Sequence, residues 1–262
     1  MDCPITSLIV LITSFAPLIA IILTSLIKAL GIPPIPQNWT LQNFYDVLVI
    51  NRTSSRAIRN SLILALSSAT IISLPGAMIA YIVVKTRLRI RGIINFISSI
   101  PYALPGTVVG VAMILAWLKP IPLIGVSIYN TLWIILVAYI ARYLAFGVRT
   151  TSASLQQIHE SMEEAARISG ATWFQTFRYI LLPLIAPGLF AGWFLVFMPT
   201  LRELTISILL WSAKNETIGV MVFNLQESGN NVASAALAVI MMLVLLLANI
   251  ITRRLTRGRV GF

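Results

Sequence analysis

The chain has 262 residues, of which 58% are apolar and only 10% carry a charge. A soluble domain carries roughly 25% charged residues, so this composition excludes an ordinary water-exposed surface. The formal net charge of +11 does not indicate nucleic-acid binding, because the basic residues lie between long apolar runs and not along one solvated face. The single cysteine, Cys3, excludes an internal disulfide.

Six apolar stretches are long enough to cross a bilayer, since about 30 Å of hydrocarbon requires roughly 20 helical residues. They cover residues 4–27, 61–84, 93–118, 128–146, 184–211 and 232–251. Each stretch is continuously apolar and not alternating, which argues against barrel strands. The first lacks the basic start and the cleavage site of a signal peptide, so we expect it to remain as a helix. The sequence therefore predicts an all-α membrane protein of about six transmembrane helices, forming one domain over residues 1–262.

Lysine and arginine set the expected orientation, because short basic loops stay on the cytoplasmic side. With the N-terminus inside, eleven of the 19 basic residues fall in cytoplasmic segments, six in outer segments, and two, Arg142 and Arg202, within the stretches. The cytoplasmic eleven are Lys85, Arg87, Arg89, Arg91, Arg149, Arg167, Arg178, Arg253, Arg254, Arg257 and Arg259. Both termini are therefore predicted to be cytoplasmic.

The third stretch is interrupted at Pro101 and again at Pro105 and Gly106. Each proline lacks the amide donor that would continue a helix. Within a membrane, such a break persists only where protein or water satisfies the freed carbonyls. Two interpretations are open: a packing kink against neighbouring helices, and a segment that lines a solute pathway or gate.

The longest expected cytoplasmic connection, residues 147–183, is too polar to span the membrane and too patterned for a slack linker. Ser161 followed three residues later by Glu164 predicts a helix start at which each side chain satisfies a free backbone donor. Gly170 predicts the left-handed end of that helix. A second helix is expected over residues 172–182, ending at the proline that follows. The connection is thus predicted to be a helix, a glycine turn and a helix on the cytoplasmic surface.

This connection resembles the EAA loop of binding-protein-dependent ABC importer permeases. The family pattern is EAA, three residues, G, nine residues and I-x-L-P, and every position matches at the family spacing. The matching residues are Glu164, Ala165, Ala166, Gly170, Ile180, Leu182 and Pro183. The similarity in layout covers a core of about residues 56–254, with the loop between the fourth and fifth stretches.

The resemblance implies a permease subunit in the bacterial cytoplasmic (inner) membrane, whose EAA loop docks as a coupling helix into a groove on separate ATPase subunits. The other implied partners are a periplasmic or extracellular solute-binding protein, a second permease copy or homologous permease chain, and the lipid bilayer. No cofactor is implied. The residues suit this role, because two alanines let a helix approach a partner closely and Gly170 allows a sharp change of direction.

A narrower resemblance, to the C-terminal half of iron(III)-type permeases, concerns the solute. It is carried by residues 201–205, 209–210, 219–220, 224–227 and 233–235. It implies ferric iron, while related branches of the family import 2-aminoethylphosphonate, polyamines or thiamine. The iron family often fuses two such halves in one chain, so we expect this single half to pair with itself or with a second permease chain.

Arg202 and Glu203 are adjacent opposite charges within the fifth stretch. At about 1.5 Å per residue from Leu184, Arg202 lies about 27 Å along the helix, near the outer end of the membrane core. Two interpretations are open: an interfacial pair or snorkelling arginine, and charges that face the outer mouth of the pathway.

Nothing in the sequence indicates an enzyme. It has no G-x-x-x-x-G-K phosphate loop, and its one histidine, His159, has no nearby cysteine or second histidine to complete a metal site. We expect His159 to be a solvated loop residue and ATP hydrolysis to be done by a separate chain. A secondary transporter or channel without an ATPase is the alternative from another class, yet Glu203 is the one acidic residue within the six stretches. A non-transporting membrane scaffold is the remaining alternative.

Overall fold

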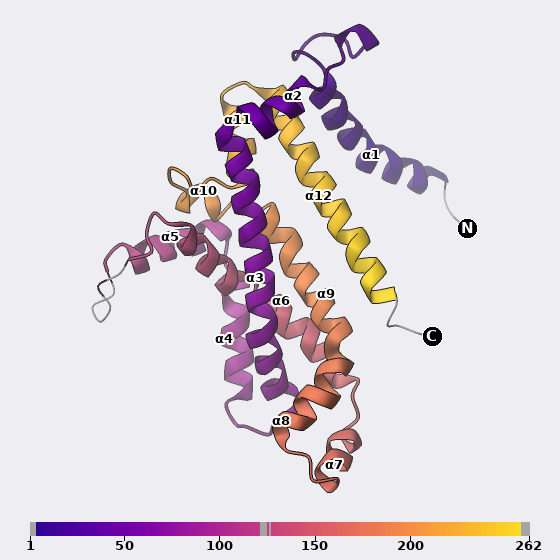
Figure 1. Ribbon diagram of the computed structural model, residues 1–262, viewed down its shortest axis with the longest axis vertical. Helices are drawn as coiled ribbons and strands as arrows, with labels where there is room; N and C mark the ends of the chain where they lie inside the picture. The colour runs from indigo at the N-terminus through magenta and orange to yellow at the C-terminus, as the bar shows by residue number, and fades with distance from the viewer. Residues whose placement is uncertain (1–3, 121–124, 126, 258–262) are drawn as a thin grey trace.

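The computed structural model describes residues 4–120, 125 and 127–257, which form helices joined by turns (Figure 1). One isolated antiparallel bridge joins Ile27 to Trp39. In chain order the elements are α1 (Pro4–Leu26), η1 (Pro36–Asn38), α2 (Gln42–Tyr45), η2 (Asp46–Ile50), α3 (Arg52–Lys85), α4 (Arg91–Ala103), α5 (Gly106–Trp117), α6 (Leu132–Gln156), α7 (Ser161–Ile168), α8 (Trp173–Thr176), η3 (Phe177–Leu181), α9 (Leu182–Leu201), α10 (Ser207–Leu210), α11 (Ile218–Glu227) and α12 (Asn231–Arg257).

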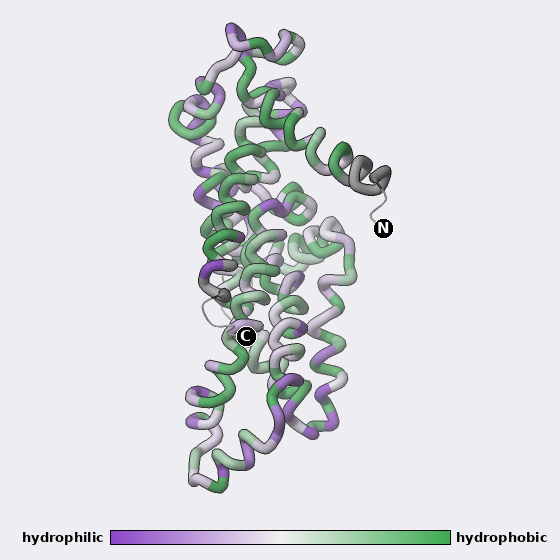
Figure 2. Tube along the Cα trace, turned by 90° about the vertical axis from the view of Figure 1, so that its right-hand side faces the viewer, coloured by the Kyte–Doolittle hydropathy of each residue, from purple (hydrophilic) through white to green (hydrophobic). Residues whose placement is uncertain are grey.

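Three long helices, α3, α6 and α9, pack on one another along the length of the molecule and form its core (Figure 1). α1 packs against α12 on one side of this core, and α5 projects from the other side. Figure 2 shows hydrophobic residues along the middle of the bundle and more hydrophilic residues toward its lower end. The lower end is where α7 and the turn after α3 lie.

Glycines permit the close approach of the three core helices. A Cβ atom at Gly76 of α3 would lie 3.0 Å from the backbone of Gly147 in α6, and a Cβ at Gly147 would lie 2.7 Å from Ile72. At Gly188 and Gly192 of α9, a Cβ would overlap side chains of α6. Backbone contact through small residues is the expected packing mode for helices in a membrane, where lipid removes the hydrophobic drive to associate.

Within the described residues, four helical segments are long and apolar enough to cross a membrane: α3, α6, Trp173–Leu201 and Asn231–Thr252. The α4 and α5 pair passes the same test together, which gives five if the pair is one span. An apolar part of α1, Leu11–Leu26, is shorter. A helical membrane protein is therefore confirmed, whereas the count of six spans and the orientation of the termini stay predictions.

The predicted break within residues 93–118 is confirmed at Pro105 and Gly106 but not at Pro101, which lies within α4, whereas residues 184–211 are wrong as one continuous helix. Residues 93–118 are bent by 106° between α4 and α5, because Leu104 and Pro105 have extended backbones with ψ of 145° and 142°. Residues 184–211 end as a helix at Leu201, after which the chain turns into the separate short helix α10.

Two predicted ends of the 147–183 connection are also wrong. α6 continues to Gln156, so the connection begins as helix. The second helix does not end at Pro183 but runs on into α9. The reason is η3, a π-helical turn in which the Leu182 N–H donates to the Phe177 carbonyl, so the hydrogen-bond pattern shifts just before the proline that has no N–H to give.

Candidate functional site

The matched EAA residues lie on α7 and the turn that follows it, at the lower end of the molecule in Figure 1. Gly170 has a φ of +78°. The Ala171 N–H donates to the Ala166 carbonyl and the Gly170 N–H to the Arg167 carbonyl, both at 3.0 Å. This pair of bonds is the Schellman motif that ends many helices. The predicted left-handed stop at Gly170 is therefore confirmed.

The predicted capping box between Ser161 and Glu164 is wrong. Ser161 is already the first residue of α7, and its N–H donates to the Nδ1 atom of His159 at 3.2 Å. His159 is exposed, as expected. A capping box forms instead at the start of α8, where Thr172 and Gln175 each accept the other's backbone N–H, at 3.3 and 2.8 Å. The spacing of a threonine and a glutamine three residues apart was the signal for it.

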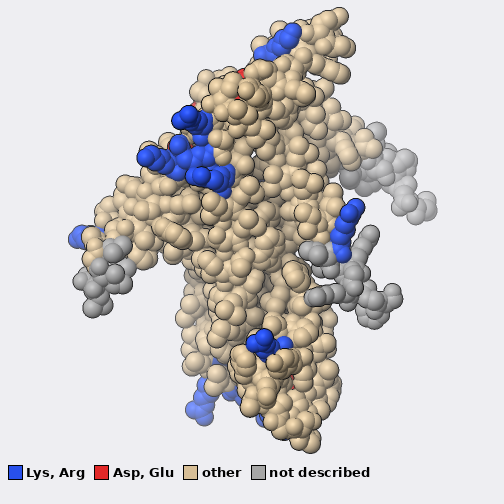
Figure 3. Space-filling model, in the orientation of Figure 1, with Lys and Arg blue, Asp and Glu red and all other residues tan. Residues whose placement is uncertain are grey.

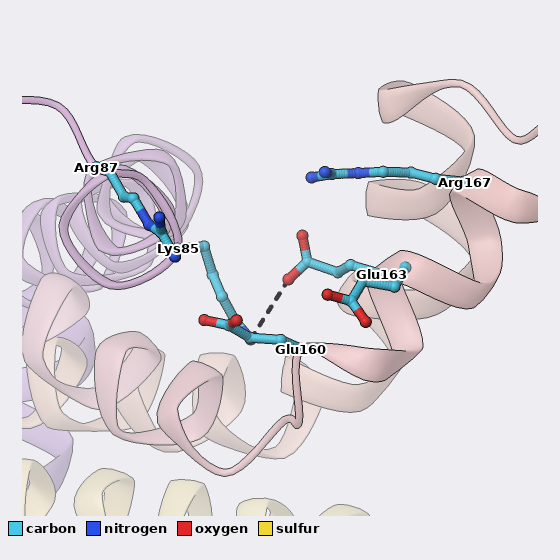
Figure 4. Close-up of a pocket in the computed structure, with 6 residues that line it drawn as sticks. Lys85, Arg87, Glu160, Glu163 and Arg167 are labelled. Atoms are coloured by element: carbon cyan, nitrogen blue, oxygen red, sulfur yellow. Dashed lines mark ion pairs between the residues drawn. The ribbon is translucent and has the colours of Figure 1, made fainter.

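A buried ion pair fastens α7 to the end of α3 (Figure 4). Lys85 Nζ lies 3.3 Å from Glu163 Oε1 and also donates to the Ile158 carbonyl at 2.7 Å. Only 6% of the Lys85 side chain and 10% of the Glu163 side chain are exposed. Glu163 lies three residues before the buried Ala166, and the two form the inward face of α7. Neither Lys85 nor Glu163 was a predicted site residue.

An aromatic cluster extends this contact. The Tyr81 hydroxyl lies 3.4 Å from Glu163 Oε2 and accepts the Trp173 indole N–H at 3.0 Å. The Tyr81 ring meets Trp173 and Phe177 edge-on, with centroids 5.7 and 6.1 Å apart. We call Tyr81, Lys85, Glu163 and Trp173 the α3 clamp. It joins α7 and α8 to one helix of the core.

The outward face of α7 is open. Glu164 and Ala165 are exposed, and Ile168 is 88% exposed. A hollow of about 700 Å³ runs along this face, and its lining includes Ser161, Met162, Ala165, Ala166, Ser169, Ala171 and Ile180. Leu182 and Pro183 lie exposed at the start of α9. Of the seven matched residues, Glu164 and Ala165 therefore lie on the outward face of α7 and Ala166 on its inward face. Gly170 forms the turn, and the remaining three lie in η3 and at the start of α9.

A second, charged hollow of about 390 Å³ separates α7 from the end of α3 (Figure 4). Its lining residues are Lys85, Arg87, Glu160, Glu163, Glu164 and Arg167. In this hollow the acidic residues come from the start of α7, and Lys85 and Arg87 come from the end of α3 and the turn that follows. Opposite charges therefore face each other across the joint between the two elements.

Of the three predicted residues at the break between α4 and α5, Gly106 is buried against neighbouring segments, Pro101 is half-buried and Pro105 is exposed. Pro101 lies within α4, Pro105 precedes α5, and Gly106 begins it. A Cβ atom at Gly106 would overlap the Thr205 side chain and lie 3.2 Å from Arg142 Nη1. Only glycine permits this approach. These contacts support the packing interpretation of the break, and its place along a pathway stays a prediction.

Arg142 supplies a hydrogen-bond donor to the backbone at this break. Its Nη1 donates to the Leu104 carbonyl at 3.0 Å, which meets the requirement that a freed carbonyl in a membrane find a partner. Arg142 lies ten residues after the start of α6, about 15 Å along it. An arginine near the centre of a span costs about 2.5 to 3.5 kcal/mol on insertion scales. That cost was the available sequence signal for Arg142, which had no predicted role.

Arg202 and Glu203 make no ion pair with each other, contrary to the interpretation of an interfacial pair. Arg202 is the exposed residue that ends α9, and Glu203 is 8% exposed. The Glu203 carboxylate instead accepts three hydrogen bonds from the turn that precedes α10. The donors are the Leu204 N–H at 3.1 Å, the Thr205 hydroxyl at 2.7 Å and the Ile206 N–H at 2.9 Å. Glu203 therefore shapes the turn that interrupts the predicted span.

At the opposite end of the molecule, the segment between α10 and α11 is held on α3. Arg56 donates to both carboxylate oxygens of Glu216, at 2.9 and 3.0 Å, and Asn60 donates to the Lys214 and Glu216 carbonyls. Burial raises the pKa of the Glu216 carboxyl, but hydrogen bonds from Arg56 and from backbone N–H groups outweigh burial and hold the pKa below its ordinary value.

A family model described as "Binding-protein-dependent transport system inner membrane component" matches residues 69–260. The spermidine/putrescine transport system permease protein PotC of Escherichia coli (strain K12) is 27% identical over 230 residues, which cover 86% of this chain and 85% of PotC. The putative 2-aminoethylphosphonate permease protein PhnV of Salmonella paratyphi A is 25% identical, over 93% of this chain and 89% of PhnV. The Fe(3+)-transport permease protein FbpB 2 of Haemophilus influenzae is 27% identical over 83% of this chain and only 42% of its own length.

Two solved structures have a similar fold. A bacterial alginate ABC transporter, in complex with an alginate pentasaccharide-bound periplasmic protein, aligns with a TM-score of 0.75 at 20% identity, over 98% of this chain and 93% of that one. The MetNI methionine ABC transporter, in an inward-facing conformation, aligns with a TM-score of 0.64 at 20% identity, over 78% and 94%. At these identities the likeness establishes the fold and no more.

Proposed function

Because the chain belongs to the family of binding-protein-dependent transport system inner membrane components, we propose that α7 is the element through which it docks on a separate ATPase chain. The protein is the permease subunit of an ABC importer and is located in the inner membrane. The family match favours this function over a secondary transporter, a channel or a scaffold. ATP hydrolysis then belongs to the docked chain.

The observation that carries the docking proposal is the two-sided character of α7. Glu163 and Ala166 are buried on the inward face, whereas Ala165 and Ile168 are exposed on the outward face beside the 700 Å³ hollow. A large apolar side chain that is 88% exposed on an otherwise anchored helix is suited to burial against a partner. Burying Ile168 and filling the hollow would supply the apolar part of that interface.

The α3 clamp would transmit a movement of the docked ATPase chain to the membrane-spanning helix α3. Lys85 and Tyr81 both contact Glu163, so a displacement of α7 by closure of the ATPase pair also displaces the end of α3. α3 has 34 residues and is about 51 Å long. It therefore reaches from the coupling end to the segment held by Arg56 and Asn60 at the other end.

In the proposed assembly, two permease chains, identical or homologous, combine with two ATPase subunits and a solute-binding protein to alternate access to a central pathway. α7 and both termini face the cytoplasm, with α1 and the bent α4 and α5 pair completing six spans. The position of the basic turn after Lys85 next to α7 supports this orientation. Pro101, Pro105 and Gly106 at the bend, and Arg202 and Glu203 after α9, are the proposed pathway or gate residues.

The solute is a separate proposal. Ferric iron follows from the resemblance of residues 201–235 to iron(III)-type permeases, with 2-aminoethylphosphonate, polyamines and thiamine as alternatives. The relatives named above carry polyamine, ferric iron and aminoethylphosphonate in their names, so their names do not distinguish these solutes. The charges of the chain itself bear on the choice.

Co-purification tests the docking proposal. The Ile168→Glu variant should reach the membrane in normal amounts but lose the ATPase chain that co-purifies with the solubilised wild type, because a charge replaces the apolar contact. Leu41→Glu is the matched control: Leu41 is 71% exposed and lies at the opposite end, before α2. Retention of the ATPase by the Ile168→Glu variant would remove α7 from the interface.

A further inference from the structure

Arg142 keeps an unneutralised positive charge beside the α4 and α5 bend. Its Nη1 donates to the Leu104 carbonyl, its guanidinium lies 5.9 Å from the centre of the Tyr143 ring, and its Nε atom is buried without a hydrogen-bond partner in the described part of the chain. The ion pairs among the described residues are Arg56 with Glu216 and Lys85 with Glu163, so no described carboxylate pairs with Arg142. An ionisable group within a span is expected to serve function.

The bend lies at an open face of the single chain. Tyr102 and Leu104, on either side of Ala103, are 42% and 40% exposed, and Thr205 is exposed next to Gly106. In a permease built from two chains, a pathway between them is an open face of each chain. Polar groups on such a face can therefore reach a solute without an enclosed pocket.

The carboxylates nearest to this face are already occupied. Glu203 accepts three hydrogen bonds from the turn that precedes α10 and is 8% exposed. Glu216 accepts both hydrogen bonds from Arg56 and a third from the Lys214 N–H. Glu203 is held by its own turn and Glu216 by Arg56, and neither carboxylate forms an ion pair with Arg142.

Exposed basic residues continue from the bend toward the end of the molecule that we propose to be external. Arg52 and Arg59 lie seven residues apart on the same side of α3 as Arg56, Arg202 follows α9, and Lys214 lies in the segment that Asn60 holds on α3. We call Arg52, Arg59, Arg202 and Lys214 the outer basic face. Figure 3 shows lysine and arginine gathered over the start of α3 and beside α10.

From these charges we propose that the solute carries an oxyanion group, a phosphonate, phosphate or carboxylate, and that Arg142 binds this group midway along the pathway. The proposal rests on the importer function above and adds the charge class of its solute. A positive lining concentrates anions and repels cations. The planar guanidinium also matches the paired oxygens of such groups. A polyamine is excluded by this field, and ferric iron passes only as an anionic chelate.

Thiol reactivity measures the field without knowledge of the solute. With Cys3→Ser removing the native thiol, Leu104→Cys places one thiol beside Arg142 in the full chain in liposomes. Its reaction rates with a negatively charged sulfonatoethyl and a positively charged trimethylammonioethyl methanethiosulfonate are compared with the rates for a free thiol. We expect the corrected ratio to favour the anion, and Arg142→Gln to lower it about tenfold. Arg89→Gln, the same change on the exposed turn after α3, should leave it unchanged.

A ratio that favours the cation overturns the proposal, and so does an absence of reaction with both reagents, because Leu104 would then not face water. Uptake supplies the second measurement, with the permease reconstituted together with its ATPase and binding protein. ATP-dependent accumulation of spermidine refutes the oxyanion class and leaves the importer function intact. The oxyanion proposal is supported if 2-aminoethylphosphonate accumulates and this accumulation falls at least tenfold in both Arg142→Gln and Arg142→Lys. Lysine keeps the positive charge but lacks the paired N–H donors of the guanidinium. Loss of ATPase docking in the Ile168→Glu test concerns the importer function alone.

Discussion

The buried ion pair of the α3 clamp makes a sharp prediction about how firmly α7 is held. Glu163→Gln keeps the shape of the side chain but removes its charge, leaving Lys85 buried with the Ile158 carbonyl as its remaining partner. At 3.3 Å and an effective dielectric constant of about 20, the gross attraction is roughly 5 kcal/mol, which the cost of desolvating both groups largely offsets. Breaking a buried pair typically costs about 3 to 5 kcal/mol. Because Lys85 keeps one hydrogen bond, we take about 2 kcal/mol for the local opening of α7.

Limited trypsin cleavage in inside-out membrane vesicles measures this opening, since α7 carries Arg167 in its last turn. If cleavage follows a rapid opening equilibrium, about 2 kcal/mol corresponds to a cleavage rate roughly 30 times faster in Glu163→Gln. Glu164→Gln is the matched control, because it removes the same charge one residue away from an exposed position without an ion pair. Equal cleavage rates in the two variants would refute the clamp as the anchor of α7.

Three further predictions concern the turn, the outer segment and the orientation. Gly170→Leu should reduce ATP-dependent uptake while the chain still accumulates in the membrane, because leucine at a φ of +78° is strained by about 1 to 2 kcal/mol. Gly170→Asn should retain more activity, because asparagine tolerates this backbone conformation better. Normal uptake in Gly170→Leu would exclude the turn from coupling. Because the pKa of Glu216 is lowered in the folded protein, its carboxylate stabilises the fold at pH values above its ordinary pKa of 4.5. This contribution is lost as the pH falls through the lower pKa of the folded state. Thermal stability should therefore drop more steeply below about pH 4.5 in the wild type than in Arg56→Gln. A reporter that is active only outside the membrane should stay silent when fused after Arg257, and strong activity there would contradict the proposed orientation.

Local rules predicted the parts of the site that depend on neighbouring residues. The stop at Gly170 follows from one left-handed residue and two short-range hydrogen bonds, which a glycine at the end of a helix signals directly. The partners of Glu163 are different. Tyr81 is 82 residues away in sequence, and nothing in the local pattern links it or Lys85 to α7. Long-range partners of this kind become visible only when the core helices are placed in space.

Hydropathy located the apolar stretches but not the points at which the backbone turns. Residues 206–210 are as apolar as the end of α9, so the predicted fifth stretch included them. In the structure, the Glu203 carboxylate accepts hydrogen bonds from the backbone N–H groups that would otherwise continue the helix. The same limit applies at Leu104, whose carbonyl is satisfied by Arg142 from another helix. In the sequence, Pro105 and Gly106 marked the break at Leu104, and the charged Glu203 marked the turn after Leu201.

The course of α3 decides how far a movement of α7 travels. Pro75 lies within α3 and removes one backbone hydrogen bond, which makes this the weakest point between the clamp and Arg56. The next residue, Gly76, is in backbone contact with Gly147 of α6, where even a methyl group would lie 3.0 Å from the neighbouring chain. A bend at Pro75 would therefore have to carry α6 with it. Because Arg142 lies five residues before Gly147 on α6, we expect displacement of the clamp to reach the Arg142 contact at the α4 and α5 bend through this glycine crossing.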